Sequence, residues 1–220
     1  MSDPRQAVAH EIASRLLSIN AVALSPDAPF TWASGRVSPV YCDNRLTLGY
    51  PDIRRAICSA FAERLALVGW RVDAVVGTAT AGIPHAAWLA EALDLPMAYV
   101  RGAAKGHGKG NRIEGHIPAG AHVVVVEDLV STGMSSTAVV APLVDAGLTV
   151  SGILAIFTYA LDAADRAFAA AGIPLETLSS YPALVESAGR SGSFDAPTLQ
   201  SLESWYRDPA AWSVAHGGAG

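Results

Sequence analysis

A hydrophobic run in the middle of the chain leads into two acidic side chains and then into a turn rich in hydroxyl groups. Residues 123–126 are four consecutive valines, and Glu127 and Asp128 follow them directly. Backbone N–H groups, hydroxyls and the positive end of a helix dipole can converge on one anion in a turn between a strand and a helix. The spacing therefore predicts a phosphate site. The residues of this turn are Ser131, Thr132, Gly133, Met134 and Ser135.

The pattern favours a monophosphate over a nucleoside triphosphate. The lysine of a GxxxxGK[ST] loop is missing, and no strand turn contains GxGxxG. Because carboxylates repel phosphate, we expect Glu127 and Asp128 to meet ribose hydroxyls, a divalent cation or positive charge developing on a sugar ring. The alternative is that the acids and hydroxyls only cap the turn and the helix.

A second turn between a strand and a helix has similar properties. It spans residues 77–84 and offers small residues, two hydroxyls and a proline near the first helical turn. By itself it would be read as a tight connection, but two such turns at one sheet edge predict a ligand with two separated phosphate groups. The residues expected to line it are Thr78, Ala79, Thr80, Ala81 and Gly82.

Residues 101–120 form an unusually long glycine-rich connection. Long loops inside a domain are functional or disordered, so this one is either a mobile cationic flap that closes over a polyphosphate or a solvated surface loop. Its cationic side chains are Arg101, Lys105, His107, Lys109 and Arg112.

The elements that must position these residues alternate between strand and helix, which indicates an α/β fold with a mainly parallel sheet. Residues 25–47 are predicted to form short extended segments and turns, and residues 217–220 a frayed tail. We expect helices at 8–19, 52–68, 84–93, 135–146 and 163–171, with a final helix at 197–206, and strands at 72–76, 97–100, 123–126 and 150–157.

Length and composition set the class of protein. The chain has 220 residues, about half of them apolar, which favours a single domain spanning 1–220. A net charge of −5 disfavours broad binding to nucleic acid or to a membrane surface. Two cysteines without ligand spacing, and no apolar run long enough to cross a bilayer, predict a soluble cytoplasmic protein.

With these features in chain order, the sequence resembles the type I phosphoribosyltransferases, and within them the bacterial orotate phosphoribosyltransferases. The stretch from Val123 to Ser136 is similar to the phosphoribosyl pyrophosphate (PRPP) motif of the superfamily. The narrower likeness comes from segments 30–45, 77–85 and 105–110.

The resemblance implies a sheet core, at about 52–160, and a small hood built from about 20–50 plus segments near the C-terminus. It implies transfer of orotate to PRPP, giving orotidine 5′-phosphate and pyrophosphate in pyrimidine (UMP) biosynthesis. It also implies Mg²⁺ bound through PRPP, without a metal site assigned to protein ligands, and a homodimer with shared active sites.

The resemblance also assigns roles to residues. Glu127 and Asp128 would contact the ribose hydroxyls, residues 131–135 the 5-phosphate, and residues 78–82 the pyrophosphate. Lys105 and His107 would stabilise the leaving pyrophosphate from the neighbouring subunit, with Lys109 in the same loop and Arg101 at its base.

The orotate end departs from the family pattern. Lysine is common in the family where Ala33 and Gly102 stand here, and arginine after the last core strand where Thr158-Tyr159 stands. The orotate pocket is expected at Tyr41, Cys42 and Ser131, with Arg45 and Arg36 as candidate partners of the carboxylate.

Three rival interpretations stay open. A purine phosphoribosyltransferase would share the phosphate and ribose sites but not the base pocket. A PRPP-sensing regulator of transcription would be expected to add a basic nucleic-acid module, and no segment combines clustered basic residues with a recognition-helix pattern. A noncatalytic nucleotide-binding scaffold would bind ligand without turnover.

Overall fold

The structure is a computed structural model that describes residues 3–102, 112–192 and 194–220. Its centre is a six-stranded sheet of order β10-β9-β8-β5-β6-β7, parallel except for β7, which pairs antiparallel with β6. The strands are β5 (Ala74–Thr78), β6 (Met97–Val100), β7 (Ile113–Gly115), β8 (His122–Val130), β9 (Thr149–Thr158) and β10 (Leu175–Ser180).

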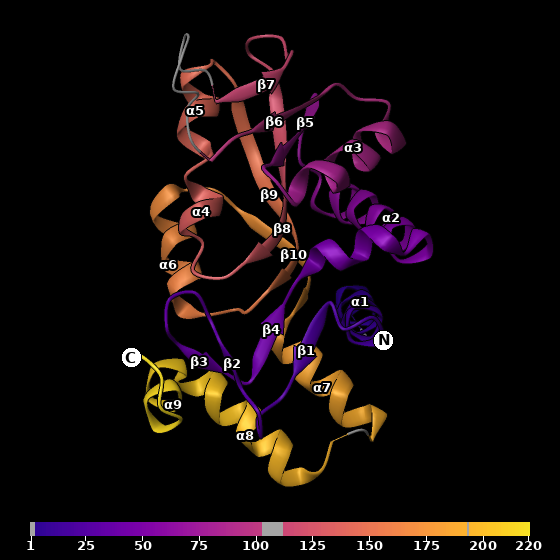
Figure 1. Cartoon of the computed structure of the whole chain (residues 1–220). Coiled ribbons are helices and arrows are strands. Elements are labelled where there is room, and N and C mark those ends of the chain that lie inside the picture. The colour runs from indigo at the N-terminus through magenta and orange to yellow at the C-terminus, as the bar shows by residue number, and fades with distance from the viewer. Residues whose placement is uncertain (1–2, 103–111, 193) are drawn as a thin grey trace.

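Helices cover both faces of this sheet, as Figure 1 shows. On one side lie α2 (Pro51–Val68) and α3 (Gly82–Leu93), and on the other α4 (Met134–Thr137), α5 (Val140–Asp145) and α6 (Asp162–Ala171). Burial on both faces explains the valine run, because residues 123–126 are all fully buried and alternate between two hydrophobic clusters. The predicted α/β fold with a mainly parallel sheet is confirmed.

The expected helix at 135–146 is wrong as one element. The chain forms α4 and α5 with a break at Ala138 and Val139. Pro142 has no N–H to donate to the carbonyl of Ala138, and its ring crowds that carbonyl, so a continuous helix is disfavoured there.

The N-terminal segment contributes a helix and a set of short strands. Helix α1 (Pro4–Ser18) packs against α7 (Tyr181–Ser191), β10 and α2. Strands β1 (Val22–Leu24) and β4 (Val40–Cys42) pair antiparallel, as do β2 (Phe30–Thr31) and β3 (Val37–Ser38). A 3₁₀ helix, η1 (Asn44–Gly49), then leads into α2. The strands lie below the sheet beside the C-terminal helices (Figure 1).

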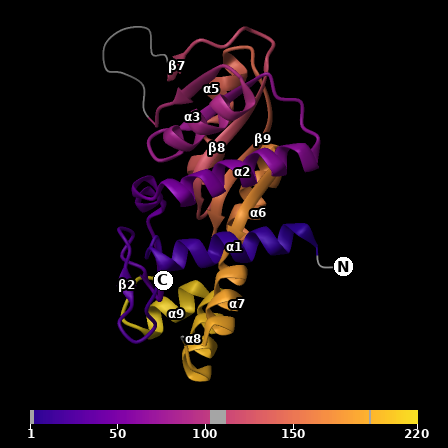
Figure 2. The ribbon, with the colours of Figure 1, turned by 90° about the vertical axis from the view of Figure 1, so that its right-hand side faces the viewer.

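The C-terminal region contains more structure than expected. Strand β10 and helix α7 were not predicted, and the helix expected to be final, α8 (Ala196–Arg207), is followed by α9 (Pro209–Ala215). The predicted fraying of 217–220 is also wrong. Ala219 N–H donates to the Gly35 carbonyl, and Arg36 donates to that of Gly220. These bonds fasten the C-terminus beside β2 and β3 (Figure 2).

An aromatic cluster joins the short strands to the end of the sheet. The ring of Trp32 lies 5.3 Å from Tyr159 and 6.1 Å from Trp205, and Trp205 lies 4.7 Å from Tyr181. Trp32 also donates from Nε1 to the Val40 carbonyl at 3.1 Å. The cluster holds the segment that contains β2, β3 and β4 over the carboxyl edge of the sheet.

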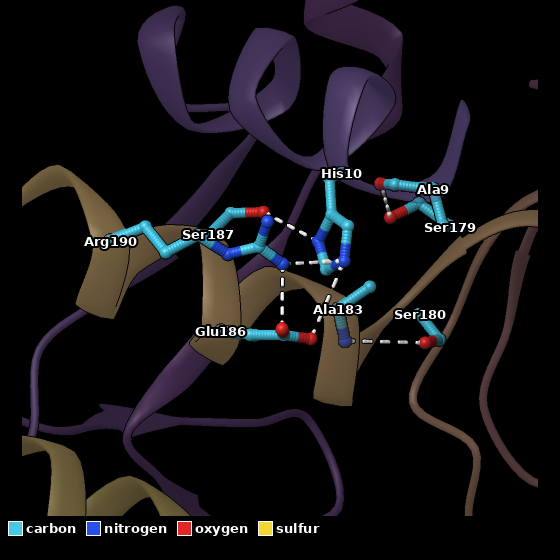
Figure 3. Close-up of polar contacts among 8 residues, drawn as sticks. All are labelled: Ala9, His10, Ser179, Ser180, Ala183, Glu186, Ser187 and Arg190. Atoms are coloured by element: carbon cyan, nitrogen blue, oxygen red, sulfur yellow. Dashed lines mark hydrogen bonds and ion pairs between the residues drawn. The ribbon is translucent and has the colours of Figure 1, made fainter. Parts of the chain in front are cut away.

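Helix α1 is held to α7 by polar contacts (Figure 3). His10 Nδ1 lies 3.2 Å from the Ser187 hydroxyl, and Arg190 lies 2.6 Å from both His10 Nε2 and Glu186.

No helix in the described part of the chain has the length and apolar character needed to cross a bilayer.

Candidate active site

The two acids lie where the strand order of the sheet reverses. Strands β5 and β8 are neighbours, yet the chain continues from β5 to β6 on the opposite side, so the crevice outside their carboxyl ends is a topological switch point. Thr78 ends β5, and Glu127 and Asp128 lie near the end of β8. The structure therefore brings together the acidic pair and Thr78, one of the residues expected to line the second turn.

Glu127 is almost completely enclosed, with 8 % of its surface exposed. Its Oε1 accepts hydrogen bonds from the Thr78 hydroxyl at 2.7 Å and from the Asp128 N–H at 3.1 Å. Its Oε2 accepts one from the Ser136 hydroxyl at 3.1 Å. Asp128 is less buried than Glu127, and its carboxylate interacts with the Leu129 N–H and with the Glu127 side chain.

Burial raises the pKa of both carboxyl groups. For Glu127, desolvation is the largest cause, opposed by the hydrogen bond from Thr78 and reinforced by the charge of Asp128. Two adjacent, partly desolvated carboxylates resist full ionisation. The site therefore favours a ligand that brings hydroxyl donors or positive charge.

The turn from Thr78 to Gly82 packs tightly against β8 on one side and is exposed on the other. Ala79 and Thr80 are exposed, and the peptide bond between them is cis. A Cβ on Gly82 would overlap the Val126 carbonyl and lie 2.5 Å from the Thr78 hydroxyl. Only glycine lets this backbone lie against β8, beneath the surface that the turn presents.

The turn from Ser131 to Ser135 is exposed at Thr132, Met134 and Ser135, and half-buried at Ser131. Gly133 has a φ of +78° and precedes the first residue of α4. Within the described residues the hydroxyls of Ser131, Thr132 and Ser135 have no hydrogen-bond partner in the chain. Because α4 has four residues, the dipole contribution expected from a longer helix is reduced.

The β4 segment meets the acidic pair from the other side. Cys42 lies close enough to Asp128 and Asp43 for their charges to raise the pKa of its thiol, although burial is the larger cause. Tyr41 is exposed beside it and its ring lies 5.6 Å from that of Phe30. Two of the three residues expected at the base pocket, Tyr41 and Cys42, thus lie on one strand, with Cys42 near Asp128.

The two candidate arginines lie in different surroundings. Arg45 is exposed and pairs with Asp43 at 2.6 Å, near enough to Asp128 for their charges to interact. Arg36 donates to the Gly220 carbonyl and lines a separate cavity of about 400 Å³ with residues 160–163 and 206–210. The geometry favours Arg45 over Arg36 as a group near the acidic pair.

Arg101 begins the predicted cationic loop and is partly paired. The Arg101 guanidinium lies 3.4 Å from Glu114, and the Arg101 backbone N–H donates to the Arg112 carbonyl. Strand β7 then returns antiparallel to β6. Lys105, His107 and Lys109 lie outside the described residues, so their predicted roles stay predictions.

Four residues near the acids were not singled out from the sequence. Asn44, 1 % exposed, donates to the Asp128 carbonyl at 2.6 Å. The Thr47 hydroxyl donates to the Asn44 carbonyl and lies 3.2 Å from His85 Nε2. Burial lowers the pKa of His85 to about 4, so its ring is neutral. Ser136 is the fourth. Asn44, His85 and Ser136 lie within the segments that carry the family resemblance, and this position was the only signal for them in the sequence.

No group of three or more metal-ligating side chains occurs among the residues that the structure describes. The acidic pair still offers the hard oxygen donors that Mg²⁺ prefers, and this ion commonly takes one or two carboxylates together with substrate phosphates. The donor set therefore fits an ion that arrives with a polyphosphate.

Comparison with known proteins identifies the family to which this region is similar. The model of the phosphoribosyl transferase domain matches residues 49–164, which include both turns and the acidic pair. Fold and site together define a phosphoribosyltransferase.

The narrower likeness extends over nearly the whole chain. It is 53 % identical over 209 residues to an orotate phosphoribosyltransferase of Cutibacterium acnes, covering 95 % of this chain and 97 % of the relative. It is 53 % identical over 203 residues to that of Bacillus caldolyticus, covering 92 % and 98 %. The crystal structure of the Aeropyrum pernix orotate phosphoribosyltransferase is similar with a TM-score of 0.72 at 33 % identity, covering 84 % and 99 %. The chain belongs to the orotate phosphoribosyltransferase family.

Proposed function

We propose that the chain joins orotate to the ribose 5-phosphate of PRPP and releases pyrophosphate, a step of pyrimidine biosynthesis. The observation that carries the proposal is the acidic pair at the switch point, with one anion-compatible turn on each side. A diphosphate at residues 78–82 and a 5-phosphate at residues 131–135 place the ribose beside Asp128 and Glu127.

The charges of the site suit ribosyl transfer. The bond to pyrophosphate breaks as positive charge develops on the ribose ring, so carboxylates beside the ring stabilise the transition state more than the ground state. Lys105, His107, Lys109 and Arg101 are proposed to stabilise the negative charge that collects on pyrophosphate. Orotate is already an anion, and we assign no general base.

The base pocket is proposed at Tyr41, Cys42 and Ser131. Because the pKa of the Cys42 thiol is raised, the thiol stays protonated and adds no negative charge against orotate. Arg45 is the proposed partner of the orotate carboxylate, since it is exposed and close to Asp128.

Mg²⁺ is proposed to enter with PRPP, where it would neutralise charge on the diphosphate. Chelation by EDTA should abolish turnover, and added Mg²⁺ should restore it. We also propose a homodimer in which the loop containing Lys105 serves the partner's site, and a cytoplasmic enzyme, since Cys42 and Cys58 are both free thiols.

The test is loss of orotate absorbance when protein is mixed with orotate, PRPP and Mg²⁺. We expect Lys105→Ala and Asp128→Asn each to lower kcat by about 100-fold or more, because each removes a charge that acts in the transition state. Equal turnover by wild type and both variants would contradict the site.

A base panel separates the remaining interpretations. If adenine or hypoxanthine is turned over but orotate is not, the assignment of the ribose and phosphate sites stands and that of the base pocket is wrong. PRPP binding without turnover of any base would favour a regulator or a scaffold.

A further inference from the structure

The Glu127 carboxylate is the point at which the two phosphate turns meet. The Thr78 hydroxyl belongs to the turn at residues 78–82 and donates to Oε1 at 2.7 Å, and the Ser136 hydroxyl follows the turn at residues 131–135 and donates to Oε2 at 3.1 Å. All three residues are buried, with 5 %, 0 % and 8 % exposure for Thr78, Ser136 and Glu127. One carboxylate therefore links two turns that approach it from different strands.

The hydrogen bonds leave this carboxylate one preferred direction for a ligand. Each carboxylate oxygen has two lone pairs. Those of Glu127 Oε1 are taken by Thr78 and by the Asp128 N–H, whereas Oε2 accepts from Ser136, and the carboxyl group also interacts with the Asp128 side chain. A ribose hydroxyl is then best received at Oε2, the oxygen that Ser136 orients.

We propose that Ser136 is a positioning residue that orients Glu127 Oε2 toward the ribose of PRPP. The inference rests on the proposed function, and it adds a residue that lies behind the ribose site rather than in it. Ser136 has no exposed surface, so it acts through Glu127 and does not touch substrate.

Its hydroxyl donates to the ionised carboxylate of Glu127. The loss of that donor should therefore act on PRPP only through Glu127. Dependence of the Ser136→Ala effect on Glu127 is a readout that a purely structural role would not show.

The first experiment compares Ser136→Ala with wild type. We expect kcat/KM for PRPP to fall about tenfold, as for the loss of one hydrogen bond to a charged group. Ser187→Ala is the matched control, because Ser187 is also a buried serine bonded at 3.2 Å, but to His10 between α1 and α7 (Figure 3). The control should leave kcat/KM unchanged.

A double-mutant cycle with Glu127→Gln decides whether Ser136 acts through the carboxylate. When Glu127→Gln is already present, Ser136→Ala should change kcat/KM by only about threefold, because neutral hydrogen bonds are roughly half as strong as charge-assisted ones. The same loss with and without Glu127→Gln would overturn the proposal.

Failure of the proposed function is distinguishable from failure of this inference. If wild type does not turn over orotate, the same cycle is read as the Kd of PRPP by calorimetry. A Ser136→Ala effect on Kd that depends on Glu127 supports the inference, and an effect independent of Glu127 overturns it.

Discussion

At the scale of single residues, Glu127 is subject to two opposing effects of its buried position. Its carboxylate is buried among hydroxyl donors, which keeps it in place, while burial itself disfavours the charge that the proposed chemistry uses. A raised pKa in the folded state means that the ionised form is less favourable there than in the unfolded chain. Glu127 is therefore a cost to stability at and above neutral pH.

Glu127→Gln should raise the free energy of unfolding while it lowers activity. A carboxyl group with a raised pKa stabilises the fold only at pH values below its ordinary pKa, and this stabilisation is lost as pH rises through the folded-state pKa. The gain in unfolding free energy on replacing Glu127 by glutamine therefore grows from pH 5 to pH 8. We expect roughly 1–3 kcal/mol at pH 8, since one pKa unit corresponds to about 1.4 kcal/mol. Urea unfolding of both proteins at each pH measures it.

Glu203→Gln is the control for this experiment. The Glu203 side chain is 58 % exposed and lies 3.7 Å from Arg207 on one helix. Its replacement should change stability by less than about 0.5 kcal/mol at either pH. A Glu127→Gln protein that is less stable than wild type at pH 8 would show that the hydrogen bonds to Glu127 outweigh its desolvation.

Gly82 is a second residue at which the site constrains sequence. Gly82→Ala should destabilise the fold by about 1–3 kcal/mol and weaken PRPP binding, because the new methyl group overlaps the backbone of β8. Gly49→Ala is the comparison, since nothing lies within 4 Å of the added Cβ. Similar unfolding curves for the two variants would contradict the close approach of the turn to β8.

At the scale of elements, α2 and the edge strand β10 are joined by a buried ion pair. Arg64, with a side chain 8 % exposed, donates to Glu176 at 2.7 Å and to the Thr177 carbonyl at 3.0 Å. Arg190 on α7 makes a pair of similar length with Glu186, but its side chain is 55 % exposed. The two pairs differ chiefly in access to water.

Arg64→Met should cost roughly 2–4 kcal/mol of unfolding free energy, because it leaves the Thr177 carbonyl without its donor and the Glu176 carboxylate with only the more distant Arg5, at 3.6 Å. Arg190→Met should cost less than about 1 kcal/mol, because water replaces the lost contacts. Chemical denaturation of both variants checks the ranking. Equal losses would mean that exposure does not decide the strength of these contacts.

At the scale of the whole molecule, the proposed dimer can be tested by mixing two inactive variants. Lys105→Ala removes the loop lysine, and Asp128→Asn removes the ribose carboxylate. If the loop of one subunit serves the site of its partner, a mixed dimer contains one intact site. Random reassociation should then restore about 25 % of wild-type activity, since half of the dimers are mixed and each has one of two sites intact.

Refolding the two variants together and separately provides the measurement. Activity that appears only after joint refolding supports shared sites. A mixture that stays as inactive as its components would indicate that each chain supplies its own loop lysine.

Local patterns in the sequence determined the main architecture and the position of the acidic pair. The valine run, the helix ending at Gly69 and the two turns each depend on neighbouring residues, so periodicity and turn chemistry were enough to predict them. Strand β10 was missed because its residues, Leu175–Ser180, are mostly polar and lie at the sheet edge, where alternation is weak.

Only the tertiary structure decided which residues support the site. Asn44 is 84 positions from Asp128, and Thr78 is 49 positions from Glu127, yet each pair is hydrogen-bonded. The C-terminal tail was expected to fray because its glycines lack local structure, whereas its partners, Gly35 and Arg36, lie on a distant hairpin. Sequence spacing determines what a residue does within its own element, and the packing of elements determines which distant donor satisfies a buried carboxylate or carbonyl.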